Sequence, residues 1–220
     1  MRSRPDRTAR FWDRVAERYA RRPVPDEAIY QTKLERTRAR LRPDMQILEL
    51  GCGTGTTALH HAPHVAHVLA TDISAKMIEI ARHKASDQGV TNVDFQVASL
   101  ETLGAGNDRF DAILALNLLH LFPDWRSAIC QIHSLLEPGG VFVSSTMCLG
   151  DSALRVFRWI APIGEAVGLL PSLRVFTATE LLAAHRAAGF GIDDDSRPGP
   201  NRAVFLIARK AGATTEGDGS

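Results

Sequence analysis

Three glycines at alternate positions follow an apolar stretch in this chain. Residues 47–55 read ILELGCGTG, in which Gly51, Gly53 and Gly55 come directly after the apolar run, and residues 69–73 read LATDI, which leads into Asp72. Glycine is needed where the backbone turns sharply or lies against a ligand, because a Cβ atom would clash there. A carboxylate at the end of the next strand can accept both hydroxyl groups of a ribose. Together the two segments predict a site for a nucleotide-like ligand.

The glycine spacing separates two kinds of ligand. The dinucleotide fingerprint is G-x-G-x-x-G, and it presents a helix N-terminus to a pyrophosphate. This chain has G-x-G-x-G instead, preceded by Glu49 inside the end of the strand. An acid at that position suits a ligand with a cationic amino-acid tail.

These two segments resemble the first and second motifs of the class I S-adenosylmethionine-dependent methyltransferases, of the small-molecule, UbiE-like kind. The resemblance covers about residues 44–210 and is best over residues 46–146. It implies a Rossmann-like fold with a seven-stranded, mostly parallel sheet. It also implies S-adenosyl-L-methionine as the cofactor and S-adenosyl-L-homocysteine as the product.

The resemblance also assigns roles to single residues. The glycine loop would underlie the methionine part of the cofactor, Glu49 would meet its amino group, and Asp72 would hold its ribose. An acid usually binds adenine after the third strand; this chain has Ser99 there, with Leu100 and Glu101 as alternatives. The implied cofactor-binding residues are Tyr30, Lys33, Glu49, Gly51, Cys52, Gly53, Gly55, Asp72, Ile73, Met77, Ser99, Leu100, Glu101, Asn117 and Leu118.

His120 is the candidate catalytic residue, in the segment FDAILALNLLHLF. A neutral imidazole can serve as a general base. His120 can equally be a packed residue that shapes the pocket, and many relatives with different substrates share the L-H pattern, which favours packing. Tyr19, Tyr30 and Lys33 could fold back over the cofactor, where Lys33 would pair with its carboxylate. Ordinary helix packing is the alternative for all three.

Composition limits the partners and the compartment. The 220 residues carry a net charge of +1, so charge indicates neither a nucleic acid nor a membrane as partner. No apolar run approaches the ~18 residues of a membrane span. Cys52, Cys130 and Cys148 lie far apart with no C-x-x-C motif, which favours a reducing, cytoplasmic compartment. A monomer and a homodimer both remain open.

Hydrophobic periodicity predicts the elements that position these residues. Phe11, Trp12, Val15 and Tyr19 share one face of the first predicted helix. Strands alternate with helices, which indicates a doubly wound parallel sheet with its ligand at the carboxyl ends of the strands. A tight turn is predicted over residues 136–140. The predicted helices are 8–21, 26–41, 56–61, 75–88, 125–136 and 179–188, and the predicted strands are 46–50, 65–71, 93–97, 110–116 and 141–146, followed by a hairpin over 190–209.

A single methyltransferase domain is expected over residues 1–210, ahead of a disordered tail at 211–220. Residues 147–176 are rich in Leu, Phe, Trp and Pro, and are expected to form, together with the N-terminal helices, the lid and pocket of a small hydrophobic or aromatic methyl acceptor; burial of the sheet edge is the alternative. The expected parts are a helical cap at 1–44, a cofactor-binding core at 45–146, the lid and acceptor segment at 147–176, and a closing helix and hairpin at 177–210.

Other functions compete with this interpretation. An NAD(P)-dependent oxidoreductase is disfavoured by the glycine spacing and by the lack of a Tyr-x-x-x-Lys pair. A non-catalytic protein that binds S-adenosylmethionine is disfavoured by the intact first motif, and a methyltransferase acting on nucleic acid or protein by the neutral charge. A metal site is not expected, because Pro63 interrupts the helix that would have to bring together His60, His61, His64 and His67.

Overall fold

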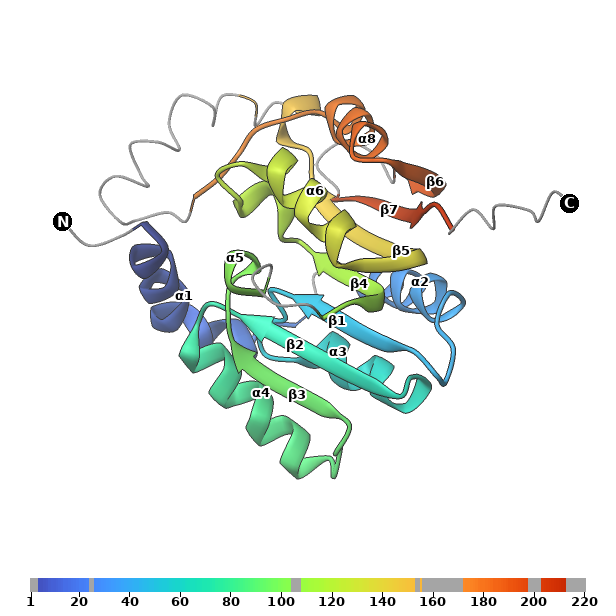
Figure 1. Cartoon of the computed structure of the whole chain (residues 1–220). Coiled ribbons are helices and arrows are strands. Elements are labelled where there is room, and N and C mark those ends of the chain that lie inside the picture. Colours follow the sequence, from blue (N-terminus) through green and yellow to red (C-terminus); the bar gives the residue numbers. More distant parts are fainter. Residues whose placement is uncertain are drawn as a thin grey trace, which may run out of the picture.

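The protein is described by a computed structural model that covers residues 4–23, 26–103, 108–152, 155, 172–197 and 203–212. Within these residues a seven-stranded sheet has the strand order β3-β2-β1-β4-β5-β7-β6 (Figure 1). Strand β7 runs antiparallel to both of its neighbours, whereas the pairings from β3 to β5 are parallel. The strands are β1 Gln46–Leu50, β2 His67–Asp72, β3 Val93–Val97, β4 Phe110–Leu116, β5 Leu136–Met147, β6 Phe190–Ser196 and β7 Ala203–Lys210.

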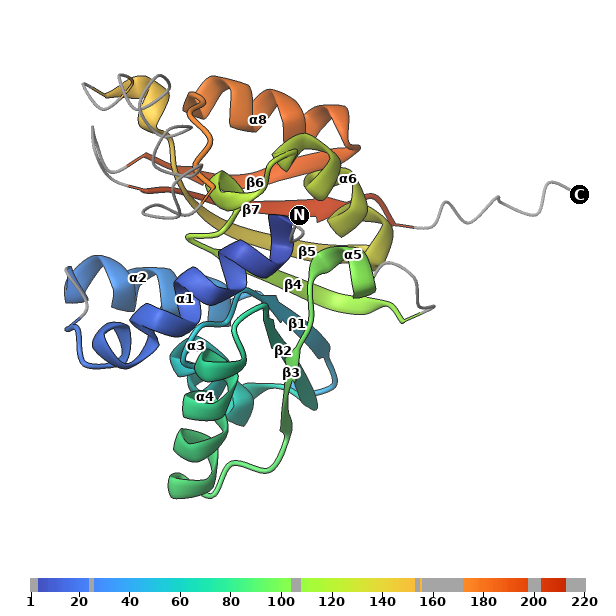
Figure 2. The same cartoon turned by 90° about the vertical axis from the view of Figure 1, so that its left-hand side faces the viewer.

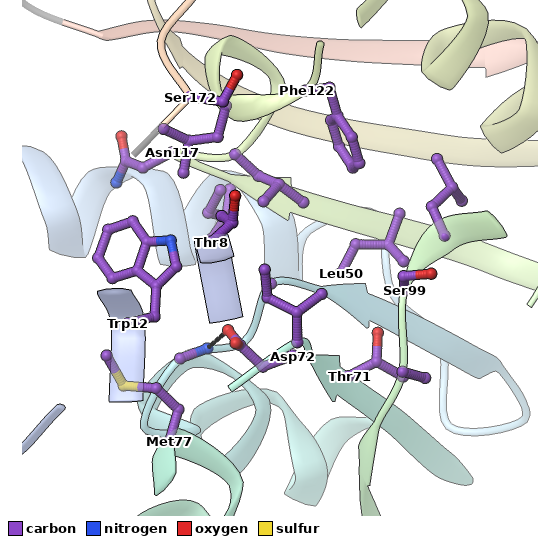
Figure 3. Close-up of a pocket in the computed structure, with 18 of the residues that line it drawn as sticks. Thr8, Trp12, Leu50, Thr71, Asp72, Met77, Ser99, Asn117, Phe122 and Ser172 are labelled. Carbon is purple, nitrogen blue, oxygen red and sulfur yellow. Dashed lines mark hydrogen bonds between the residues drawn. The ribbon is translucent and has the colours of Figure 1, made fainter. Parts of the chain in front are cut away.

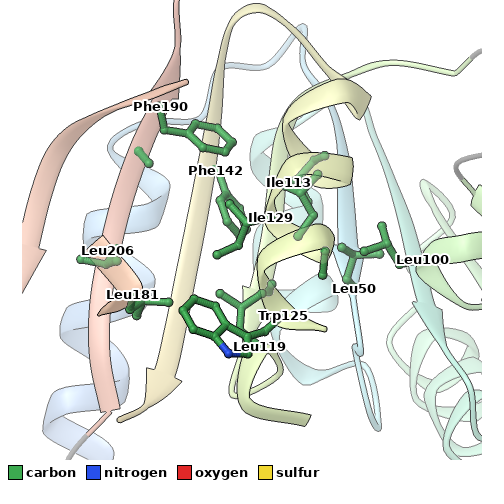
Figure 4. Packing of buried hydrophobic residues seen from close by; sticks show 14 of the residues in the cluster. Leu50, Leu100, Ile113, Leu119, Trp125, Ile129, Phe142, Leu181, Phe190 and Leu206 are labelled. Atoms are coloured by element: carbon green, nitrogen blue, oxygen red, sulfur yellow. The ribbon is translucent and has the colours of Figure 1, made fainter. Parts of the chain in front are cut away.

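Apolar residues alternate between the two faces of this sheet, and each face has its own core. In β1, Leu48 and Leu50 belong to the core under α6 and α8 (Figure 4), while Ile47 belongs to the core under α3 and α4. Burial of both faces explains why β4 reads as a continuous apolar run. The helices are α1 Arg4–Ala20, α2 Glu27–Arg38, α3 Thr56–His61, α4 Ala75–Asp87, α5 Leu100–Leu103, α6 Trp125–Leu135 and α8 Ala178–Ala187, with short 3-10 helices at Ala62–His64, Leu119–Leu121 and Leu149–Asp151.

The two N-terminal helices are tied to different parts of the domain. Helix α2 reaches the closing hairpin, because Arg36 pairs with Asp194 and Arg40 lies 3.6 Å from Asp193. Helix α1 packs along α4 and crosses in front of the sheet, near the carboxyl ends of the parallel strands (Figure 2). Its position places one helix face over the site that the sheet edge forms.

The prediction of a tight turn over residues 136–140 is wrong. Strand β5 already begins at Leu136, where it pairs with Phe110 before the register shifts between Phe110 and Ala112. The Pro-Gly-Gly sequence therefore forms an irregular strand start, which its glycines can accommodate. Most of the predicted lid, and residues 213–220 of the predicted tail, lie outside the described residues. In the part of the chain that the structure describes, no helix is long and apolar enough to cross a membrane.

Candidate functional site

The glycine turn after β1 is built from backbone that only glycine adopts readily. Gly51, Gly53 and Gly55 have φ angles of 62°, 54° and 77°. A Cβ atom on Gly51 would lie 2.7 Å from Leu118, and one on Gly55 would lie 2.8 Å from both Ala81 and Phe95. A Cβ atom on Gly53 would meet only the Tyr19 ring, at 3.7 Å. The outer glycines are therefore fixed by packing within the protein, whereas Gly53 is the one that faces open space.

Asp72 ends β2 beside this turn, and its carboxylate is held by two backbone donors. The amide of Gly53 donates to Oδ2 at 3.0 Å, and the amide of Ser74 donates to Oδ1 at 2.8 Å. Burial raises the pKa of Asp72, while these two hydrogen bonds act in the opposite direction. Each oxygen keeps further lone pairs, so the carboxylate can still accept hydrogen bonds from a ligand.

A cavity of about 390 Å³ opens over the carboxyl ends of the strands. Asp72 and Phe122 lie on opposite sides of it, and Trp12 of α1 closes a third side (Figure 3). Its volume lies within the range of small-molecule sites. The described lining residues are Thr8, Trp12, Tyr19, Leu50, Gly51, Gly53, Thr71, Asp72, Ile73, Met77, Ala98, Ser99, Leu100, Glu101, Leu116, Asn117, Leu118, Leu121, Phe122, Pro123 and Ser172.

Most of the predicted cofactor residues meet on this wall. Asn117 adopts a positive φ of 55° there. Its backbone amide donates to the backbone carbonyl of Ser145 at 2.6 Å, which fixes the turn after β4. The predicted residues that line the cavity are Gly51, Gly53, Asp72, Ile73, Met77, Ser99, Leu100, Glu101, Asn117 and Leu118. The predicted residues outside the described lining are Tyr30, Lys33, Glu49, Cys52 and Gly55.

Two of the residues outside the lining have partners elsewhere. The Tyr30 hydroxyl and the Thr57 hydroxyl form a hydrogen bond of 3.2 Å, and Lys33 Nζ donates to the Ser145 hydroxyl at 2.8 Å. Burial lowers the pKa of Lys33. Contact between these side chains and a cofactor remains a prediction.

Some lining residues were not predicted as site residues. Trp12 had a signal, because its helical spacing with Tyr19 required a docking surface; the two rings lie edge to face at 6.4 Å. Phe122 ends the segment FDAILALNLLHLF, and Ser172 lies in the predicted acceptor segment 147–176, but neither was singled out; Pro123 had no signal. Arg174 links the two segments: its amide donates to the His120 carbonyl at 2.7 Å, and its Nε donates to the Pro123 carbonyl at 3.1 Å.

Glu49 is an acid buried without a compensating donor. The residue is 3% exposed, and its Oε2 atom has no hydrogen-bond partner among the described residues. Burial, assisted by the carboxylate of Asp72, raises the pKa of Glu49 to about 8. A buried carboxylate normally has a hydrogen-bonding or cationic partner, so this position fits a ligand that brings a positive charge.

The proton on Glu49 makes stability depend on pH. The unfolded carboxyl group has a pKa near 4.5 and the folded one a pKa of about 8, so the stabilisation by protonated Glu49 is complete below pH 4.5 and is lost as pH rises through 8. We expect the free energy of unfolding of the wild type to fall across this window relative to that of Glu49→Gln. Urea unfolding of both ligand-free proteins at several pH values measures the difference. A difference that stays constant with pH would contradict the assignment.

His120 is buried and is not among the described lining residues, and its Nδ1 atom has no hydrogen-bond partner within the part of the chain that the structure describes. Burial lowers the pKa of His120 to about 4, so the imidazole is neutral at pH 7. Burial also lowers the pKa of His61, to about 3. Among the described residues, no group of three or more His, Cys, Asp or Glu side chains could hold a metal ion.

Known structures share this fold. The structure of DhpI in complex with S-adenosylhomocysteine (SAH) superposes with a TM-score of 0.71 at 22% identity, over 95% of this chain and 97% of that one. The crystal structure of YcgJ from Bacillus subtilis superposes with a TM-score of 0.67 at 19% identity, over 82% of this chain and 99% of that one. At these identities the likeness shows the fold alone.

Sequence comparison identifies the family. Residues 47–140 match a family described as a methyltransferase domain. The chain is 34% identical over 105 residues to the uncharacterized methyltransferase YcgJ of Bacillus subtilis, which is 48% of this chain but only 42% of YcgJ's length. It is 34% identical over 207 residues to a ubiquinone biosynthesis O-methyltransferase of Xanthomonas axonopodis pv. citri, across 88% of this chain and 82% of that protein. Because this last match spans most of both chains, the protein belongs to the S-adenosylmethionine-dependent methyltransferases.

Proposed function

We propose that this methyltransferase transfers a methyl group from S-adenosylmethionine to a small hydrophobic or aromatic acceptor by in-line displacement. One observation carries the proposal: a single cavity extends from the carboxylate of Asp72 to the apolar side chains of Leu121 and Phe122. A polar end suits the sugar of a nucleoside, and an apolar end suits a hydrophobic acceptor. The cofactor and the acceptor would lie in the same cavity, as a direct methyl transfer requires.

The cofactor would lie along the glycine turn. Asp72 would accept hydrogen bonds from the ribose hydroxyls, since its present backbone donors leave lone pairs unused. Glu49 would bind the amino group, which supplies the positive charge that its buried carboxylate lacks. Ile73 and Met77 would pack against adenine, and Ser99 and Glu101, which both line that end, are the candidates for its exocyclic amine.

The cofactor supplies a methyl group on a sulfonium sulfur. A lone pair of the acceptor can attack the methyl carbon and displace the sulfur, which leaves in S-adenosylhomocysteine. The protein's part is therefore alignment and exclusion of water. Trp12, Leu121 and Phe122 support the second task, because their apolar side chains wall the cavity beyond Asn117. Carbonyl oxygens at this strand end can add weak contacts to polarised C–H bonds.

The lining favours an acceptor that needs little help to lose its proton. Among the described lining residues the titratable side chains are Tyr19, Asp72 and Glu101, the last two of which the cofactor would occupy. A phenol fits this requirement, and the name of the Xanthomonas relative, an O-methyltransferase, supports an oxygen acceptor. His120 stays the candidate base for acceptors that ionise less readily, provided that it moves towards the cavity.

Binding of the product tests the cofactor half of the proposal. We expect S-adenosylhomocysteine at 100 times its dissociation constant to raise the free energy of unfolding by about 2.7 kcal/mol, because a ligand that binds only the folded state stabilises it by mass action. NADH at the same concentration is expected to give no shift in melting temperature. Stabilisation by NADH but not by S-adenosylhomocysteine would contradict the proposal.

A labelled-methyl transfer screen tests the acceptor half. Phenols, carboxylic acids, thiols and amines of similar size are offered with S-adenosylmethionine, and we expect transfer to aromatic hydroxyl compounds. Transfer only to charged or large acceptors would show that the apolar wall does not select the acceptor.

A further inference from the structure

Helix α1 supplies one side of the cavity through Thr8, Trp12 and Tyr19, which recur at spacings that place them on one helix face. In Figure 2 this helix lies in front of the sheet, outside the parallel strands whose ends it covers. A cofactor held between the strand ends and α1 would contact this helix face, because Thr8, Trp12 and Tyr19 line the same cavity as Asp72. The contacts that hold α1 in place therefore bear on binding.

Asp13 connects α1 to the start of α4. Its Oδ1 atom accepts a hydrogen bond of 2.6 Å from the Ser74 hydroxyl and one of 3.1 Å from the Lys76 amide. Ser74 is the N-cap of α4, and its hydroxyl also accepts from the Met77 amide at 3.1 Å. An acid at the N-terminus of this 13-residue helix is also favoured by the helix dipole.

The same serine leads directly to the cofactor end of the cavity. The Ser74 amide donates to Oδ1 of Asp72 at 2.8 Å, and the other oxygen of Asp72 accepts from the Gly53 amide at 3.0 Å. Asp13 is thus linked to the glycine turn by a continuous chain of hydrogen bonds through Ser74 and Asp72. The nearby charge of Asp13 also contributes to raising the pKa of Asp72, after the larger effect of burial.

We propose that Asp13 is a positioning residue that latches α1 over the cavity, and that it couples closure of this helix to occupation of Asp72 by the cofactor. The proposal rests on the proposed function, which places the ribose on Asp72. A ribose that fixes Asp72 also fixes Ser74, and thereby holds the hydrogen-bond partner of Asp13 in place. By thermodynamic reciprocity, a latched helix then retains the cofactor more strongly.

The latch has a consequence for the order of binding. Trp12 completes the apolar side of the cavity only while α1 is docked on α4. If cofactor binding strengthens that docking, the acceptor pocket is better formed after the cofactor is bound. The cofactor should therefore bind first, and the Michaelis constant for the acceptor should rise when the latch is broken.

The rate at which S-adenosylhomocysteine leaves the protein tests the latch. We expect Asp13→Ala to release radiolabelled S-adenosylhomocysteine about tenfold faster than the wild type when excess sinefungin is added as the competitor, because two hydrogen bonds to a charged, half-buried group are lost. Asp13→Asn keeps an oxygen acceptor and should show a smaller change. Glu17→Ala is the matched control, since this exposed acid on the same helix pairs with Arg21, at 3.4 Å, and not with α4.

A second measurement separates a latch from simple support of the fold. Amide hydrogen exchange of residues 8–20 should slow when S-adenosylhomocysteine is added to the wild type, and should stay fast in Asp13→Ala, while exchange in the central strands is the same in both. Wild-type release rates together with wild-type slowing of α1 in Asp13→Ala would overturn the proposal. Should Asp13→Ala fail to fold, Asp13→Asn carries the same test. Absence of any binding to the wild type would instead refute the proposed function.

Discussion

Asp72→Ala is expected to weaken binding of S-adenosylhomocysteine at least 100-fold. Two ribose hydroxyls would lose a charged acceptor, and a net hydrogen bond to a charged group contributes about 1.5–3 kcal/mol. Helix α1 forms one side of the site, so water can replace the lost acceptor only in part. Isothermal titration calorimetry on the wild type and the variant measures the ratio of the two dissociation constants.

Two further variants make this result specific. Asp72→Asn keeps the size of the side chain but removes the charge and turns an amide group towards one of the two backbone donors, so we expect a similar loss. Asp87→Asn changes an exposed acid at the end of α4 and should bind like the wild type. Because Asp72→Ala leaves the amides of Gly53 and Ser74 without their acceptor, urea unfolding of the ligand-free variant checks that the fold is retained. Binding within threefold of the wild type in Asp72→Ala would remove Asp72 from the cofactor site.

The sheet was predictable because its signals are local. Strands β1, β3 and β4 have the predicted bounds, since apolar runs and, in β3, alternating apolar residues need no tertiary information. The mostly parallel sheet and the antiparallel hairpin are also confirmed. The start of β5 was not predictable, because Leu136-Glu137-Pro138-Gly139-Gly140 has the composition of a turn and joins the strand only through the pairing of Leu136 with Phe110 of β4.

The site also has one part that the local sequence predicts and one part that it does not. Its cofactor half comes from strand ends and the turns directly after them, where position in sequence determines position in space, as for Asp72 and Asn117. Its other half comes from α1 and from loops. Trp12 could be recognised as needing a partner, but only the docking of α1 on α4 determines which one. Ser172 reaches the wall because Arg174 bonds to the carbonyls of His120 and Pro123, contacts that no local pattern encodes.

Gly55→Ala is expected to destabilise the protein by about 2–6 kcal/mol. Its φ of 77° costs a non-glycine residue about 1–3 kcal/mol, and the added Cβ atom would stand 2.8 Å from both Ala81 and the Phe95 ring. These neighbours are buried, belong to α4 and β3, and cannot withdraw without disturbing the core on that face, which adds about 1–3 kcal/mol of overpacking. Urea unfolding followed by circular dichroism measures the loss.

Two other glycines separate the cost of backbone strain from the cost of overpacking. Gly89 has a φ of 64°, but no atom lies within 4 Å of the position that an added Cβ atom would take, so Gly89→Ala should show the backbone strain alone, about 1 kcal/mol. Gly53→Ala should cost a similar amount, because the nearest atom is Tyr19 Cε1 at 3.7 Å, yet it should weaken binding of S-adenosylhomocysteine at least tenfold, since its methyl group would occupy the cavity. Equal destabilisation by Gly55→Ala and Gly89→Ala would show that the turn is not fixed by packing beneath it. Unchanged affinity in Gly53→Ala would place the cofactor away from the turn, because no ligand against that backbone could accept the extra methyl group without moving.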